Sequence, residues 1–147
     1  MMHIVISTEV NGFYLDLIDH FDENLFRFLL PKILPVRLIE FGGSKKGDTV
    51  HLRFLGLIQA DWISRIVEHG VNDNEAYFVD EGVSVPFGIT KWRHRHVVRH
   101  LSQEKSFIID DIHFAGQNRF MTFLLYPILY LSFLPRKSLY KKYFRRV

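Results

Sequence analysis

Two histidines and one aspartate are the best candidates for chemistry in this sequence. His94 and His96 stand two residues apart in the alternating run of residues 91–99, so both side chains point to the same face of the predicted strand. Asp110 lies on the more apolar face of the next predicted strand, and we expect its carboxylate to lie within reach of His94 or His96. An imidazole beside a carboxylate can transfer a proton or anchor a polar group of a ligand.

Three interpretations of these residues stay open. In the first, which is favoured, Asp110 and one histidine only satisfy each other inside the sheet, because a buried charge needs a partner. The second makes them a functional site. A metal site of His94, His96 and Asp110 is the third, but His-x-His is common by chance and the spacing fixes no further ligand. We therefore predict no metal and no cofactor.

Other catalytic patterns are missing or misplaced. The sequence contains no cysteine, which excludes thiolate nucleophiles, disulfides and cysteine-ligated zinc. Residues 42–47 are rich in glycine but lack the Walker spacing, and a predicted strand follows them instead of a helix. Ser102 and Lys105 fit a Ser-x-x-Lys pattern on a predicted turn, where no helix brings the lysine to the serine. We expect chemistry from neither segment.

The composition predicts one domain with a large apolar core. The chain has 147 residues, of which 48% are hydrophobic and 15% aromatic, and we assign all of residues 1–147 to a single domain. The formal charge of +3 arises mainly from the last dozen residues, without a nucleic-acid-reading motif, so we predict no nucleic-acid partner. The lack of cysteine and of a secretory signal pattern predicts a cytoplasmic location. The oligomeric state is not predicted.

The spacing of apolar residues predicts an α+β fold. Alternation indicates strands near residues 3–10, 36–41, 49–55, 57–69, 76–80, 91–99 and 106–114, and two short helices follow the first strand. Residues 119–144 form a long last helix, which Pro127 and Pro135 should bend or split. Its first half is apolar on every face, so we expect it to be completely buried. A sheet of seven antiparallel strands should curl around this helix.

This order of elements resembles the SRPBCC superfamily, which comprises START-like and Bet v 1-like proteins and proteins similar to polyketide cyclases and dehydrases. The resemblance also rests on the basic aromatic run of residues 91–96, the acidic strand of residues 108–114 and the aromatic last helix that closes on Arg136-Lys137. It implies a helix-grip fold with a deep apolar cavity for lipids, sterols, polyketides or similar compounds. Only some members of the superfamily are enzymes.

We predict that the chain binds a small apolar ligand between the sheet and the last helix. Phe87 lies in the loop of residues 81–89, whose composition suits either a lid or an ordinary connection. The side chains expected to hold the ligand are Trp62, Phe78, Phe87, Trp92, His94, His96, Asp110, Ile112, Phe123, Tyr126 and Tyr130.

Two other functions stay open. A cyclase- or dehydrase-like enzyme would use a His-Asp pair to take a proton from a carbon acid. A docking module would press residues 120–134 and the basic residues after them against a membrane or a protein. This apolar stretch is shorter than the roughly 20 residues that span a bilayer, so a core helix is favoured. If docking is the role, loss of residues 136–147 should abolish localisation without unfolding the domain.

Overall fold

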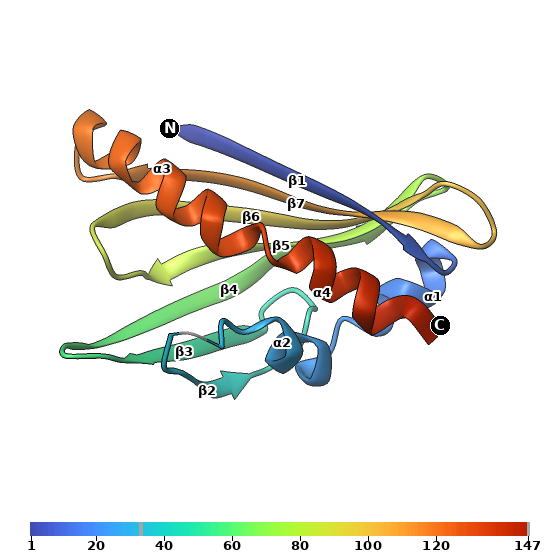
Figure 1. Cartoon of the computed structure of the whole chain (residues 1–147), viewed down its shortest axis with the longest axis horizontal. Coiled ribbons are helices and arrows are strands. Elements are labelled where there is room, and N and C mark those ends of the chain that lie inside the picture. Colours follow the sequence, from blue (N-terminus) through green and yellow to red (C-terminus); the bar gives the residue numbers. More distant parts are fainter. Residues whose placement is uncertain (33, 147) are drawn as a thin grey trace.

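One antiparallel sheet dominates the computed structural model, which describes residues 1–32 and 34–146 (Figure 1). Its strands follow the spatial order β1-β7-β6-β5-β4-β3-β2, so the first strand closes one edge beside the last. The seven predicted strands are thereby confirmed. Their bounds are β1 (Met2–Asn11), β2 (Val36–Phe41), β3 (Thr49–Leu55), β4 (Gln59–Val71), β5 (Glu75–Ser84), β6 (Ile89–His100) and β7 (Lys105–Gly116).

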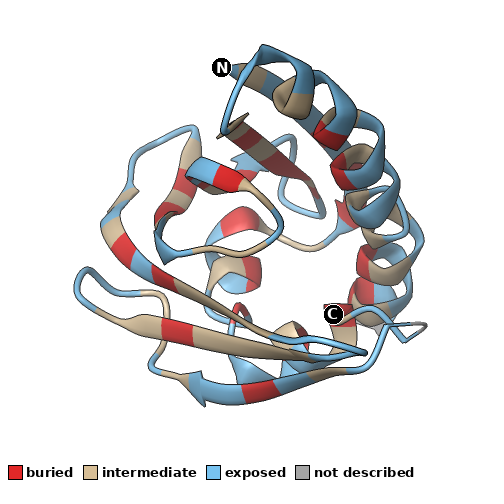
Figure 2. Cartoon of the chain, turned by 90° about the vertical axis from the view of Figure 1, so that its left-hand side faces the viewer, coloured by how far each residue is buried: buried red, intermediate tan, exposed pale blue. Residues whose placement is uncertain are grey.

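The sheet is strongly curved, as the view in Figure 2 shows. In β1, buried and exposed residues alternate, with Ile4 and Ile6 on the concave side and His3 and Val5 outside. Two register shifts in the pairing of β4 with β5 add one extra residue to each strand, and bulges of this kind increase bending and twist. The predicted curl of the sheet is therefore present.

Two short helices follow β1, as predicted: α1 (Tyr14–Ile18) and α2 (Glu23–Leu29). The Asp22 carboxylate caps α2 by accepting a hydrogen bond from the backbone N–H of Leu25 at 3.0 Å. Leu17 and Leu25 are fully buried and pack into a core cluster that also holds Phe21 and Phe78. These helices close one end of the curved sheet (Figure 1).

The C-terminal segment consists of α3 (Arg119–Phe133) and α4 (Arg136–Tyr143), followed by a 3-10 turn. Pro135 splits the predicted helix, whereas Pro127 lies inside α3. Pro127 is exposed, so water can reach the carbonyl that loses its helical hydrogen bond. Among the described residues, no helix is both long and apolar enough to cross a membrane.

The prediction that the first half of this segment is completely buried is wrong. In α3 only Leu125 and Leu129 are buried, while Phe120, Ile128 and Leu131 are exposed. The helix packs against β7 and β1, at one side of the curved sheet, and therefore covers its inner face with one stripe of side chains.

The second helix of the pair belongs to the core. Tyr140 and Phe144 are only 1% and 0% exposed and pack against Phe21, with α4 lying along β1 and α2. The burial of Tyr140 and Phe144 argues against the expectation that residues 136–147 can be lost without unfolding. The neighbouring Lys141 and Lys142 are exposed, and docking through these charges stays a prediction.

We expect Phe144→Ala to lower the free energy of unfolding by about 3 to 5 kcal/mol, because it removes a fully buried ring and leaves a cavity. Lys142→Ala, two residues earlier on the exposed side, should change it by less than about 0.5 kcal/mol. Urea unfolding followed by circular dichroism measures both. Equal, small changes in the two variants would contradict the core position of Phe144.

Candidate functional site

A cavity of about 620 Å³ lies between the concave face of the sheet and the helices. Its walls come from α2, α3, α4 and the five strands β2, β3, β4, β5 and β6, and most of the lining side chains are apolar. Ligand pockets in proteins typically measure about 300 to 1,000 Å³ and combine apolar walls with a few polar groups. The size and lining thus suit a small organic molecule.

Most of the residues predicted from the strands lie at this cavity. The wall includes Trp62, Phe78, Phe87, Trp92, His94 and His96. Asp110 and Ile112 are on β7, are almost inaccessible, and lie behind the wall. The prediction placed Asp110 at the ligand itself, whereas the structure places it one layer further out, in contact with His94.

The structure corrects the predicted inward face of α3. Phe123 is 68% exposed, and Tyr126 and Tyr130 stack on each other outside the wall, beside Phe114. The wall takes a different stripe of the helix, namely Met121, Leu124, Leu125, Ile128, Leu129 and Ser132. These positions recur at helical spacing, but apolar residues on every face of the segment concealed which stripe points inward.

Two carboxylate-imidazole pairs form the polar part of the site. His94 Nε2 lies 2.9 Å from Asp110 Oδ1, and His96 Nε2 lies 2.7 Å from Asp80 Oδ2. The ring centroids of His94 and His96 are 3.6 Å apart, and His94 Nδ1 is 3.7 Å from Asp80 Oδ2. The predicted pairing of Asp110 with a histidine of the neighbouring strand is confirmed.

Asp80 is a site residue that the sequence analysis missed. It lines the cavity from β5, directly opposite His94 in the register, and also accepts a hydrogen bond from Trp92 Nε1 at 3.0 Å. Ala76 and Phe78 precede it on the same face of β5, and both are buried. This alternation was a usable signal, because it places Asp80 inside the sheet.

Arg136 is the second missed residue. It follows the α3–α4 junction, lines the cavity, and donates a hydrogen bond from Nη1 to Asp110 Oδ1 at 3.2 Å. Its guanidinium also lies over the Phe133 ring, 4.5 Å from the centroid. In the sequence Arg136 is one of many basic residues near the C-terminus, and only its helical spacing from Leu129 and Ser132 marks it as inward.

Burial and charge set the protonation of this group. Burial lowers the pKa of His96 to about 4, aided by His94 and opposed by Asp80. Burial alone would raise the pKa of Asp110, but Arg136 and His94 outweigh it and bring that pKa to about 2. The pKa of Asp80 is also lowered. Burial alone would raise it, but the hydrogen bond and charge of His96 outweigh that effect. At neutral pH the site thus holds two carboxylates, one guanidinium and a neutral His96.

The arrangement has two chemical capabilities. A neutral imidazole held by a carboxylate can exchange hydrogen bonds or a proton with a molecule in the cavity. Ligand atoms of Asp80, His94 and His96 also lie within 4.8 Å of one another, so these three residues could hold a metal ion. The metal alternative from the sequence named Asp110 in place of Asp80.

Comparisons with solved structures show the fold. The Zhui aromatase/cyclase from a Streptomyces species has a TM-score of 0.71 and 10% identity, over 99% of this chain and 94% of that one. Norcoclaurine synthase from Thalictrum flavum, in complex with dopamine and hydroxybenzaldehyde, has a TM-score of 0.68 and 12% identity, over 99% and 88%. An uncharacterised protein from Bacillus thuringiensis reaches 0.61 at 19% identity, over 97% and 98%.

Neither a family model nor a curated protein matches the sequence. Identities this low show a shared fold, and that fold is the one which the resemblance to the SRPBCC superfamily implied. The helix-grip prediction, with a seven-stranded antiparallel sheet and a C-terminal helix, is confirmed.

The low pKa of His96 predicts a specific dependence of stability on pH. Its pKa is about 4 in the folded chain and 6.5 in the unfolded one, so the unfolded chain binds more protons between these values. Stability should therefore fall as the pH falls from about 6.5 to about 4, by up to about 3 kcal/mol at roughly 1.4 kcal/mol per pKa unit.

His96→Asn removes this titration, so its unfolding free energy should change less over the same pH range than that of the wild type. Urea unfolding at half-unit steps from pH 4.5 to 7.5 measures both slopes. In the wild type Asp80 and Asp110 titrate below this range and add no slope to it. Parallel slopes for the two proteins would show that His96 is not held neutral by burial.

Proposed function

We propose that this chain binds a small, mainly apolar molecule in the cavity and holds one polar group of that molecule at the buried histidines. The observation that carries the proposal is an apolar cavity with one cluster of paired polar side chains in its wall. Asp80, His94, His96 and Arg136 all reach the cavity and are connected to one another directly or through Asp110.

Apolar contact would supply most of the affinity. Burial of apolar surface contributes about 25 cal/mol per Å², from which the cost of association is subtracted. Trp62 and Trp92 meet edge to face with centroids 4.8 Å apart and present flat surfaces suited to an aromatic or polycyclic ligand. A hydroxyl or carbonyl of the ligand would hydrogen-bond to His96 or Arg136, because those of their nitrogen atoms that Asp80 and Asp110 do not use would otherwise be cut off from water in an apolar complex.

Phe87 favours a lid, one of the two roles that the sequence left open for its loop. It lines the cavity, is more than half exposed, and packs edge to face on Phe54 at 5.1 Å. Its φ of 64° lies in the left-handed region, which is uncommon for a bulky residue and is followed by Gly88 in the same region. We propose that the strain at Phe87, next to a glycine that adopts this region freely, lets Phe87 swing as a ligand passes.

The structural neighbours favour the same class of ligand. Norcoclaurine synthase holds dopamine and hydroxybenzaldehyde, which are small aromatic compounds, and Zhui is an aromatase/cyclase. By extension, we propose an aromatic compound or a polyketide as the ligand here, with lipids and sterols as further candidates. We also propose a cytoplasmic location, on the basis of the sequence without cysteine.

Binding of the fluorescent apolar probe 1-aminoanthracene tests the proposal. Leu129→Trp places a large side chain in the cavity and should weaken binding at least tenfold, whereas Leu131→Trp makes the same change on the exposed side of α3 and should leave it unchanged. Fluorescence titration gives both affinities, and urea unfolding confirms that both variants fold. Equal affinity in the two variants would show that the probe binds elsewhere.

Proton transfer is the second candidate function, and the His94–Asp110 pair favours it. The imidazole lines the cavity while the carboxylate lies behind it, an order in which the carboxylate can orient and stabilise the imidazole as a base. In addition, Asp110 Oδ2 is buried and has no hydrogen-bond partner among the described residues. The substrate would be an aromatic ketone or a polyketide with an acidic carbon–hydrogen bond.

Exchange of the acidic protons of 2-tetralone in deuterated buffer, followed by NMR, tests this candidate. The wild type should accelerate exchange relative to buffer alone. In His94→Asn the acceleration should be at least about 100-fold smaller, because a positioned base typically contributes about 100-fold or more. His20→Asn changes an exposed histidine and should exchange like the wild type. Exchange at the buffer rate, or unchanged by His94→Asn, would leave binding as the sole proposed function.

A further inference from the structure

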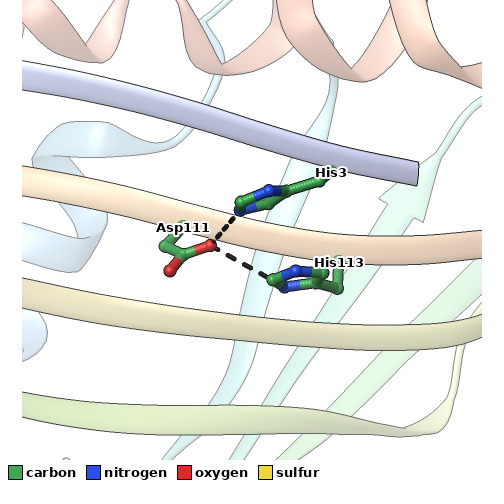
Figure 3. Close-up of side chains that lie close together, drawn as sticks. All are labelled: His3, Asp111 and His113. Atoms are coloured by element: carbon green, nitrogen blue, oxygen red, sulfur yellow. Dashed lines mark hydrogen bonds and ion pairs between the residues drawn. The ribbon is translucent and has the colours of Figure 1, made fainter. Parts of the chain in front are cut away.

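A second cluster of ligand-type side chains, drawn in Figure 3, lies on the outer face of the sheet, because its residues alternate with the buried residues of β1 and β7. His3 of β1 and His113 of β7 are direct partners in the register of these strands. Asp111 lies two residues before His113 and therefore projects from the same face. The structure thus brings together residues from the two ends of the sheet-forming part of the chain.

The three side chains converge on one point. His3 Nε2 lies 2.6 Å from Asp111 Oδ1, and His113 Nδ1 lies 3.7 Å from the same oxygen. The two imidazole rings stack with centroids 4.0 Å apart and an angle of 12° between their planes. Figure 3 shows both rings beside the carboxylate, and the three ligand atoms lie within 4.8 Å of one another.

We propose that His3, Asp111 and His113 form a binding site for a divalent transition-metal ion of the Zn²⁺ type, with water as the remaining ligand. Imidazole and carboxylate are ligands that Zn²⁺ accepts in sites with three protein ligands. Bonds of about 2.0 Å in a tetrahedral site place neighbouring ligand atoms about 3.3 Å apart. The observed separations of 2.6 and 3.7 Å lie on either side of that value.

The side chains are free to make this small adjustment. They are 49%, 26% and 42% exposed for His3, Asp111 and His113, so modest rotations bring all three atoms to the ion without moving the strands. Their exposure also leaves the open position to water.

Two arginines on β6 are the cations nearest to this site in the register. Arg95 is opposite Asp111 and Arg93 is opposite His113. Both guanidinium groups are engaged on the other side of β6, Arg95 with Glu75 at 2.9 Å and Arg93 with Glu81 at 2.5 Å. These ion pairs compensate the positive charge that would otherwise repel a metal ion.

Isothermal titration calorimetry of the untagged protein with ZnCl₂ at pH 7.5 tests the site. We expect one ion to bind, with the affinity at least tenfold lower in His113→Ala and in Asp111→Asn. His100→Ala is the matched exposed-histidine control and should bind like the wild type. Circular dichroism verifies that the variants fold, and Co²⁺ should broaden the imidazole NMR signals of His3 and His113 in the wild type.

Three results would overturn the proposal. The first is that the wild type binds no Zn²⁺ at millimolar concentration, and the second is that His113→Ala binds it with unchanged affinity. The third is that Asp80→Asn loses binding while the variants of the outer cluster keep it. The last result would assign the ion to the interior group of Asp80, His94 and His96. Since the outer cluster shares no residue with the cavity, its test is independent of the proposed ligand.

Discussion

The position of the C-terminal helices relative to the sheet is the constraint on which the rest of the structure depends. They pack mainly against β1 and β7, at one side of a curved seven-stranded sheet, and the inner face of the other strands remains open to a cavity. The closed end is filled by α1, α2, Tyr140 and Phe144, so the cavity has an apolar floor. A helix centred in the arc would fill this space and leave no site.

The position of these helices at one side of the sheet also explains why polar side chains can lie deep inside the domain. Arg136 begins α4 just after the break at Pro135, which directs its guanidinium towards Asp110 on β7. His94 and His96 are buried between the two apolar clusters of the core, with His96 stacked on Phe78 and His94 against Phe133. Each charge in the group therefore has a partner, which is the condition for keeping ionised side chains away from water.

Much of the fold could be predicted from the sequence, because strands with one buried face alternate and short connections favour antiparallel neighbours. The contact of Asp110 with either His94 or His96 followed from the same alternation, and the structure assigns it to His94. The inward face of α3 could not be predicted, since a helix that is apolar all round contains no sign of its orientation. Its exposed Phe123 shows that hydrophobic character alone does not mean burial.

Other features depend on contacts between distant parts of the chain. His3 and Asp111 are 108 residues apart in sequence, and their contact follows from the pairing of the first strand with the last. Arg136 could not be separated from its basic neighbours, because its only signal is helical spacing from a stripe of α3 whose inward direction was unknown. The assignment of residues 1–147 to one domain stays a prediction, as does the identity of the ligand.

Intermolecular nuclear Overhauser effects in a complex with 1-aminoanthracene test the central claim most directly. If the molecule occupies the cavity beneath the sheet, its protons should show these effects to the methyl groups of Leu129 and Ile89, both of which line the wall. The methyl groups of Leu131, on the outer side of α3, should show none. Effects to Leu131 without any to Leu129 or Ile89 would contradict the account and place the ligand on the outside of the helix.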